Sequence, residues 1–140
     1  MANGEYGKYF MTDVITPGRF GDRLTFRSRE HEVVGEKNFT ILWYRFTEPI
    51  LLVSEPHAHD FDQFLHFYGA DSSNIRDFDA EVEISLGEES EKHIITEPTV
   101  LHIPKHTIHC PINFKIVKKP LIFMNVALTP YYDPTASIQH

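Results

Sequence analysis

Three histidines and one glutamine are the residues of this sequence best suited to chemistry. His57 and His59 are separated by one residue, Gln63 follows four positions later, and His109 lies far downstream. Side chains alternate between the two faces of a strand, so His57, His59 and Gln63 share one face if the strand is regular. Neutral imidazole is the commonest metal ligand among protein side chains. The spacing therefore predicts a metal site that His109 completes from a distant strand.

Phe61 and Gln63 keep the parity of the first two histidines, so both are expected to face inward. The amide oxygen of Gln63 could be a fourth metal ligand, or it could hydrogen-bond a bound water. Asp62 is a competing oxygen ligand. Its parity places it on the opposite face of a regular strand, and only a bulge would reverse this assignment.

The segments that must position these residues have the patterns of strands. Residues 80–86 alternate strictly, with Val82, Ile84 and Leu86 on the core side. Residues 39–46 are rich in β-branched and aromatic side chains, which favour strands. Further strands are expected over 12–15, 24–27, 50–53, 63–68, 92–96, 100–103, 113–117 and 121–128. No long segment has helical periodicity, so the sequence predicts an all-β sandwich or barrel, such as a double-sheet jelly roll enclosing a site.

Three further residues near the histidines have open or minor roles. His102 is either a pocket residue near the metal or an exposed strand histidine, because its parity cannot be carried across the loop that follows it. His106 lies in that loop and is expected to face solvent. Cys110 follows His109 directly, so on a strand its thiol should point away from the metal and pack as a small apolar group.

Composition and charge exclude several classes of function. A chain of 140 residues with 41% hydrophobic residues is expected to fold as one domain with a packed core. A formal net charge of −7 argues against nucleic acid as a partner, because such proteins carry basic patches. A single cysteine rules out an intrachain disulfide, and no membrane-spanning run or secretory signal is recognised, so a cytoplasmic protein without a membrane partner is expected.

The two histidine segments resemble the two motifs of the cupin superfamily. The first motif is His-x-His followed by three or four residues and a carboxylate, and His57, His59 and Gln63 match its spacing. In the second motif, proline, glycine, histidine and asparagine stand at fixed intervals, which Pro104, His109 and Asn113 match. The chain is most similar to small single-domain, cupin 2-like members, and the resemblance covers roughly residues 49–128.

The sequence departs from the cupin motifs at several positions. Gln63 replaces the usual glutamate, His106 replaces a glycine, and Pro98 stands where the second motif begins with a glycine. Gly69 falls one residue before the glycine that closes the first motif. The Gln63 replacement has a chemical consequence, because a neutral amide is a poor general base.

The resemblance implies a double-stranded β-helix barrel with a divalent transition metal inside it. Carried over position by position, His57, His59 and His109 are the imidazole ligands, and Gln63 takes the fourth position. Cupins hold iron, nickel, manganese, copper or zinc, and they are frequently dimers, so a homodimer is expected. The single cupin domain would span residues 1–140, with residues 1–11 and 130–140 as loose tails or as tails that wrap over the body or a neighbouring subunit.

The expected ligand set favours a small anionic partner. Three imidazoles and an amide bring no negative charge, so a divalent ion would keep its formal charge of +2 until water or substrate binds. The first hypothesis is an enzyme of the oxygenase, lyase or isomerase type that acts on a small anionic metabolite. The second is a non-catalytic small-molecule-binding or sensing protein, and the third is a structural cupin whose metal only braces the sheets.

Overall fold

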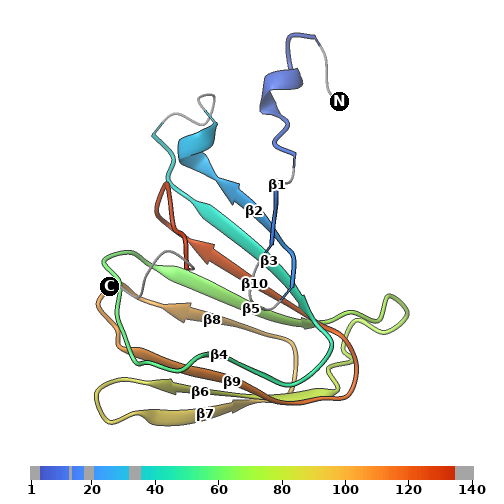
Figure 1. Ribbon diagram of the computed structural model, residues 1–140, viewed down its shortest axis with the longest axis vertical. Coiled ribbons are helices and arrows are strands. Elements are labelled where there is room, and N and C mark those ends of the chain that lie inside the picture. Colours follow the sequence, from blue (N-terminus) through green and yellow to red (C-terminus); the bar gives the residue numbers. More distant parts are fainter. Residues whose placement is uncertain (1–3, 13, 18–20, 32–35, 135–140) are drawn as a thin grey trace.

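Two antiparallel sheets face each other in the computed structural model (Figure 1). The structure describes residues 4–12, 14–17, 21–31 and 36–134. One sheet has the strand order β1-β2-β3-β10-β5-β8, and the other has the order β4-β9-β6-β7. The strands are β1 (Val14–Thr16), β2 (Arg23–Arg27), β3 (Thr40–Phe46), β4 (Ile50–Val53), β5 (Gln63–Gly69), β6 (Ala80–Leu86), β7 (Glu91–Ile95), β8 (Thr99–Ile103), β9 (His109–Val117) and β10 (Leu121–Ala127).

The core lies between the sheets and is built by alternation. Val82 and Ile84 of β6 are buried, as the strict pattern of that strand predicts. Phe114 of β9 meets aromatic side chains of the opposite sheet, with ring centroids 4.9 Å from Phe46 and 5.6 Å from Phe123. Such edge-on aromatic pairs add to the stabilisation from burial. The architecture is the all-β, double-sheet jelly roll that the sequence predicts.

The two short helices of the described residues are single 3-10 turns, η1 (Gly7–Tyr9) and η2 (Ser28–Glu30). Neither of them is long or apolar enough to cross a membrane.

The backbone around the histidines differs from the regular strands expected for it. His57 and His59 precede β5 in a connecting segment, and His57 makes only an isolated bridge to His109. Its amide donates to the His109 carbonyl at 3.0 Å, and the His109 amide donates back at 2.8 Å. β9 begins at His109, whereas the sequence pattern predicts this strand only from residue 113. Long-range pairing therefore aligns the two histidine segments.

A bulge in β9 interrupts its alternation just after His109. Ile84 and Leu86 of β6 pair with Ile112 and His109, so three steps on β9 oppose two on β6. Cys110 has a φ of 87°, in the left-handed region that non-glycine residues seldom adopt. As a result, His109 and Cys110 are both buried although they are neighbours in sequence.

β2 presents its polar side chains to the interior. Arg23, Thr25 and Arg27 are buried, whereas the apolar Leu24 and Phe26 between them are only half-buried. Thr25 pairs in register with Leu42 of β3, which is fully buried in the core, so the polar row shares the inner face. This row adds to the polar side chains of the barrel interior, where His59, Gln63, His109 and Asn125 are also buried.

Candidate metal centre

The rings of three histidines lie close to one another. The ring centroid of His57 lies 4.4 Å from that of His109 and 4.8 Å from that of His59, and the His59 and His109 centroids are 5.4 Å apart. His59 and His109 are buried, and His57 is half-buried. The structure thus brings together the three histidines that the motif spacing selects, although they arrive from a loop and a strand end.

Backbone carbonyls orient two of these rings. Nδ1 of His57 lies 2.9 Å from the carbonyl oxygen of Glu55, and Nδ1 of His109 lies 2.9 Å from that of Thr107. A carbonyl can only accept, so in both rings Nδ1 carries the proton and donates it. In the neutral tautomer with Nδ1–H, the lone pair of the ring lies on Nε2. This is the arrangement in which metal-binding histidines are held, with the second nitrogen fixed by a hydrogen bond.

Gln63 supplies an oxygen to the barrel interior. Its side chain is buried on the inner face of β5, alternating with Phe64 on the outer face. Its Nε2 donates to Oδ1 of Asn125 on β10 at 3.3 Å. Its Oε1 is buried, and no described residue hydrogen-bonds to it. A buried oxygen that accepts no hydrogen bond lowers the stability of the fold. An oxygen of this kind fits the fourth-ligand position that the motif assigns to Gln63.

Cys110 lies beside the histidines, which corrects the expectation that it points away. Its Sγ and one ring nitrogen each of His57 and His109 lie within 4.8 Å of one another. The bulge turns the side chain inward, because a left-handed φ breaks the alternation on which the expectation rested. Burial raises the pKa of the Cys110 thiol to about 12, so the group is neutral in the absence of a metal. Within the described part of the chain, no carboxylate belongs to this group.

Two aromatic rings enclose the centre. Phe61 stacks on His59 with ring centroids 4.7 Å apart, in keeping with its inward parity. Tyr132 meets the edges of both rings, at 5.3 Å from His59 and 5.5 Å from Phe61. Burial raises the pKa of Tyr132, so its hydroxyl stays protonated. Sequence reasoning did not select Tyr132, because it lies in a tail without a core pattern.

His102 and Asp62 lie outside the centre. His102 neighbours the buried Ile103 on β8, and it projects from the outer face, half-exposed and stacked on Phe64 at 4.7 Å. Its Nε2 is 2.9 Å from Oδ2 of Asp62, and the pKa of that carboxyl is lowered by this hydrogen bond and by the Lys105 amide. Of the two alternatives for His102, the structure therefore has the exposed strand histidine, and the pocket assignment is corrected.

His106 is also exposed, and its backbone amide reaches the centre by donating to the His59 carbonyl at 2.7 Å. This contact fixes the segment that carries His59 against the β8–β9 connection. His106 is thus exposed at its side chain, as expected for a loop residue.

The barrel is shared with proteins of known structure. A single-residue variant of oxalate decarboxylase from Bacillus subtilis superposes with a TM-score of 0.58 at 14% identity over 91% of this chain. The capsular polysaccharide assembling protein CapF from Staphylococcus aureus gives 0.57 at 8% identity, also over 91%. This chain spans 30% and 32% of those chains, respectively. No family model matches the sequence, and no curated protein sequence matches it.

These similarities define the class of fold. The double-sheet barrel is a cupin fold, as the two histidine motifs lead one to expect. At this level of identity the likeness concerns the fold alone, and the chemistry has to be argued from the residues of this chain.

Proposed function

We propose that this protein is a metal-dependent cupin enzyme of the oxygenase, lyase or isomerase type that acts on a small anionic metabolite. The observation that carries the proposal is the orientation of His57 and His109. Both rings donate Nδ1–H to a backbone carbonyl, which is the tautomer whose Nε2 can bind a metal, and both rings lie beside that of His59. A divalent transition metal held by His57, His59, His109 and Gln63 would polarise a carbonyl or carboxylate oxygen as a Lewis acid.

The donor set supports the anionic character of the substrate. Imidazole and amide ligands are neutral, and Cys110 is a neutral thiol while its pKa stays high. The protein therefore supplies no compensating negative charge at this point, and an anion is the natural complement. The protonated Tyr132 hydroxyl can in addition donate a hydrogen bond to such an anion.

The comparison with oxalate decarboxylase is consistent with this proposal. One solved structure of that enzyme is described by its Mn(II) centres, so a cupin barrel of this shape holds a divalent transition metal in at least one relative by fold. Manganese is thus the first metal to test here, together with iron, nickel, copper and zinc.

The decisive experiment is elemental analysis of tag-free protein after reconstitution with each of these metals. We expect near-stoichiometric binding in the wild type and its loss in His109→Ala. His93→Ala is the matched control, because His93 is exposed on β7, where its ring hydrogen-bonds the exposed Glu91. Circular dichroism checks that each variant is folded. Absence of metal from the folded wild type would overturn the proposal.

Turnover is tested separately on the metal-loaded protein with a panel of small mono- and dicarboxylates. Oxygen consumption reports oxygenase chemistry, and product analysis under nitrogen reports lyase or isomerase chemistry. Tight binding of an acid without product would instead support the non-catalytic binding or sensing protein.

A further inference from the structure

A buried arginine stands inside the barrel. Arg23 of β2 is 3% exposed and lies on the inner face of the larger sheet. Removing a guanidinium from water is costly unless charged and hydrogen-bonding partners compensate for it. A fold that places an arginine here has to satisfy up to five N–H donors in its interior.

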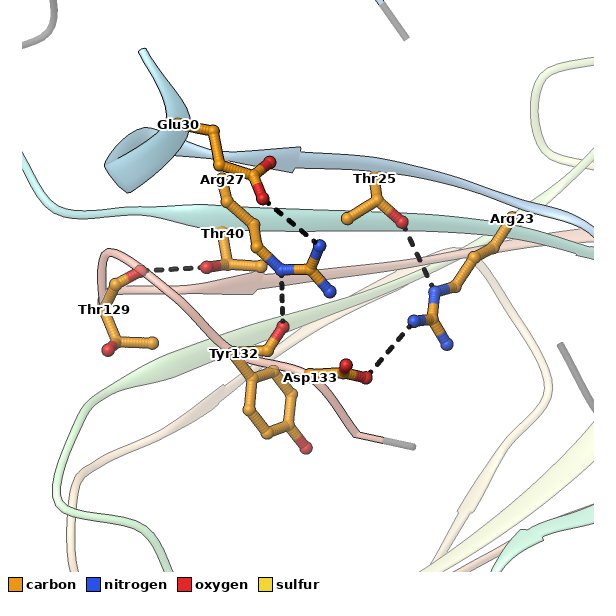
Figure 2. Close-up of polar contacts among 8 residues, drawn as sticks. All are labelled: Arg23, Thr25, Arg27, Glu30, Thr40, Thr129, Tyr132 and Asp133. Atoms are coloured by element: carbon orange, nitrogen blue, oxygen red, sulfur yellow. Dashed lines mark hydrogen bonds and ion pairs between the residues drawn. The ribbon is translucent and has the colours of Figure 1, made fainter. Parts of the chain in front are cut away.

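The partners that the protein supplies to Arg23 are distant. Its Nε lies 3.4 Å from Oγ1 of Thr25, and one terminal nitrogen lies 3.5 Å from Oδ1 of Asp133 (Figure 2). A bidentate pair between arginine and a carboxylate has two contacts of roughly 2.7–2.9 Å. The contact between Arg23 and Asp133 is much longer than that. The pair between Arg23 and Asp133 is therefore loose. A carboxylate in bidentate contact with the guanidinium would form stronger hydrogen bonds.

Asp133 belongs to a segment that lies across the inner polar row. Figure 2 shows the chain from Thr129 to Asp133 passing beside the side chains of Thr40 and Arg27, with Asp133 facing Arg23. Thr40 donates to the Thr129 carbonyl at 3.0 Å, and Arg27 Nε donates to the Tyr132 carbonyl at 3.2 Å. These anchors hold the segment upstream of Asp133 independently of the contact between Asp133 and Arg23.

Tyr132 connects Arg23 with the histidines. Its ring contacts His59, as described above, and the next residue, Asp133, pairs with the Arg23 guanidinium. Arg23 and the histidine cluster therefore face one interior and are connected through Tyr132 and Asp133. The buried Tyr44 on the neighbouring strand also lies near Arg23; burial raises the pKa of its hydroxyl, and the nearby guanidinium opposes this rise.

We propose that Arg23 determines specificity by binding a carboxylate of the substrate, and that Asp133 occupies this position when substrate is absent. The ligand class is a small acid with one carboxylate for the guanidinium and a second oxygen donor for the histidine centre, as in short dicarboxylates and 2-oxo acids. The inference rests on the proposed function, because the second donor is assigned to the metal. Asp133 marks the position, since it is itself a carboxylate held by Arg23.

The test uses malonate as the probe and its uncharged diamide as the reference, by titration calorimetry on metal-loaded protein. Arg23→Gln should weaken malonate binding by about ten- to a hundredfold, the effect of losing hydrogen bonds to a charged group. Asp133→Asn should strengthen it by about tenfold, because the internal competitor loses its charge. Arg45→Gln is the matched control, because Arg45 is exposed on the neighbouring strand, and its affinity should equal that of the wild type.

Metal content measured on the same samples separates the two proposals. A metal-loaded wild type that binds malonate no more tightly than the diamide overturns the role of Arg23, as does an Arg23→Gln variant with wild-type affinity. An Asp133→Asn variant with unchanged affinity overturns the exchange with Asp133. The folded wild type could also take up no metal and still bind malonate. If Arg23→Gln then loses malonate binding, the result supports the arginine site and overturns the metal-dependent function. A folded Arg23→Lys variant with intermediate affinity would support paired recognition by the guanidinium rather than charge alone.

Discussion

Replacing Gln63 by glutamate tests the fourth-ligand position most directly. The change swaps an NH₂ group for an oxygen and adds one negative charge at a side chain that is 2% exposed. In metal-free protein a carboxylate could not replace the hydrogen bond that Nε2 donates to Asn125, and burial of its charge would be unfavourable. In metal-loaded protein the same carboxylate would be an anionic ligand, so the two states should respond in opposite directions.

The magnitude follows from burial and chain length. An unsatisfied buried polar group costs roughly 1–3 kcal/mol, and we take about 2 kcal/mol for the metal-free variant. An unfolding entropy of about 2.1 cal/mol/K per residue over the 140 residues of the chain gives about 3.4 °C per kcal/mol. The Tm of metal-free Gln63→Glu should therefore lie about 7 °C below that of the wild type. With metal, the affinity should rise at least about tenfold, which is about 1.4 kcal/mol.

The assay is thermal unfolding with and without metal, combined with competition against a chelator. Asn74→Asp is the control, because it makes the same exchange of an amide for an acid on an exposed loop. A metal-free Tm that falls while the metal affinity stays at the wild-type value would refute the assignment of Gln63 as a ligand. An unchanged Tm in both states would refute the view that its oxygen is sequestered.

Three further outcomes are expected. His57→Ala should abolish stoichiometric metal binding in folded protein, as measured by elemental analysis, and full occupancy would contradict the ligand set. Asp62→Asn should lower the Tm at neutral pH, and the difference should shrink as the pH falls through the native pKa of Asp62. That pKa is held below its usual value chiefly by the hydrogen bond with His102, so the stabilisation is complete above the unfolded pKa and is lost below the native one. Cys110 should react slowly with a thiol reagent at pH 8 in metal-free native protein and rapidly in denaturant, because burial raises its pKa to about 12; equal rates would show that the thiol is not sequestered.

Local sequence pattern was sufficient to predict most of the strands. The alternation over residues 80–86 predicts β6, and the β-branched and aromatic run over residues 39–46 predicts β3. Alternation reports which side chains meet apolar surroundings, and that information is local. The residues at which the strands begin and end were less predictable. β9 extends back to His109 because it pairs with His57, more than fifty residues away in the sequence, and no local pattern encodes such a pairing.

The sequence by itself determined that three histidines and Gln63 are candidates for one site, because residue type and parity are written in it. The tertiary structure decided the surroundings of that site. A bulge opposite β6 turns Cys110 inward, where simple parity points it outward. Arg23 can face the interior because Asp133, 110 residues later, lies against it. A buried charge depends on partners that only the folded chain brings within reach, and this is why the polar interior could not be inferred from the strand pattern alone.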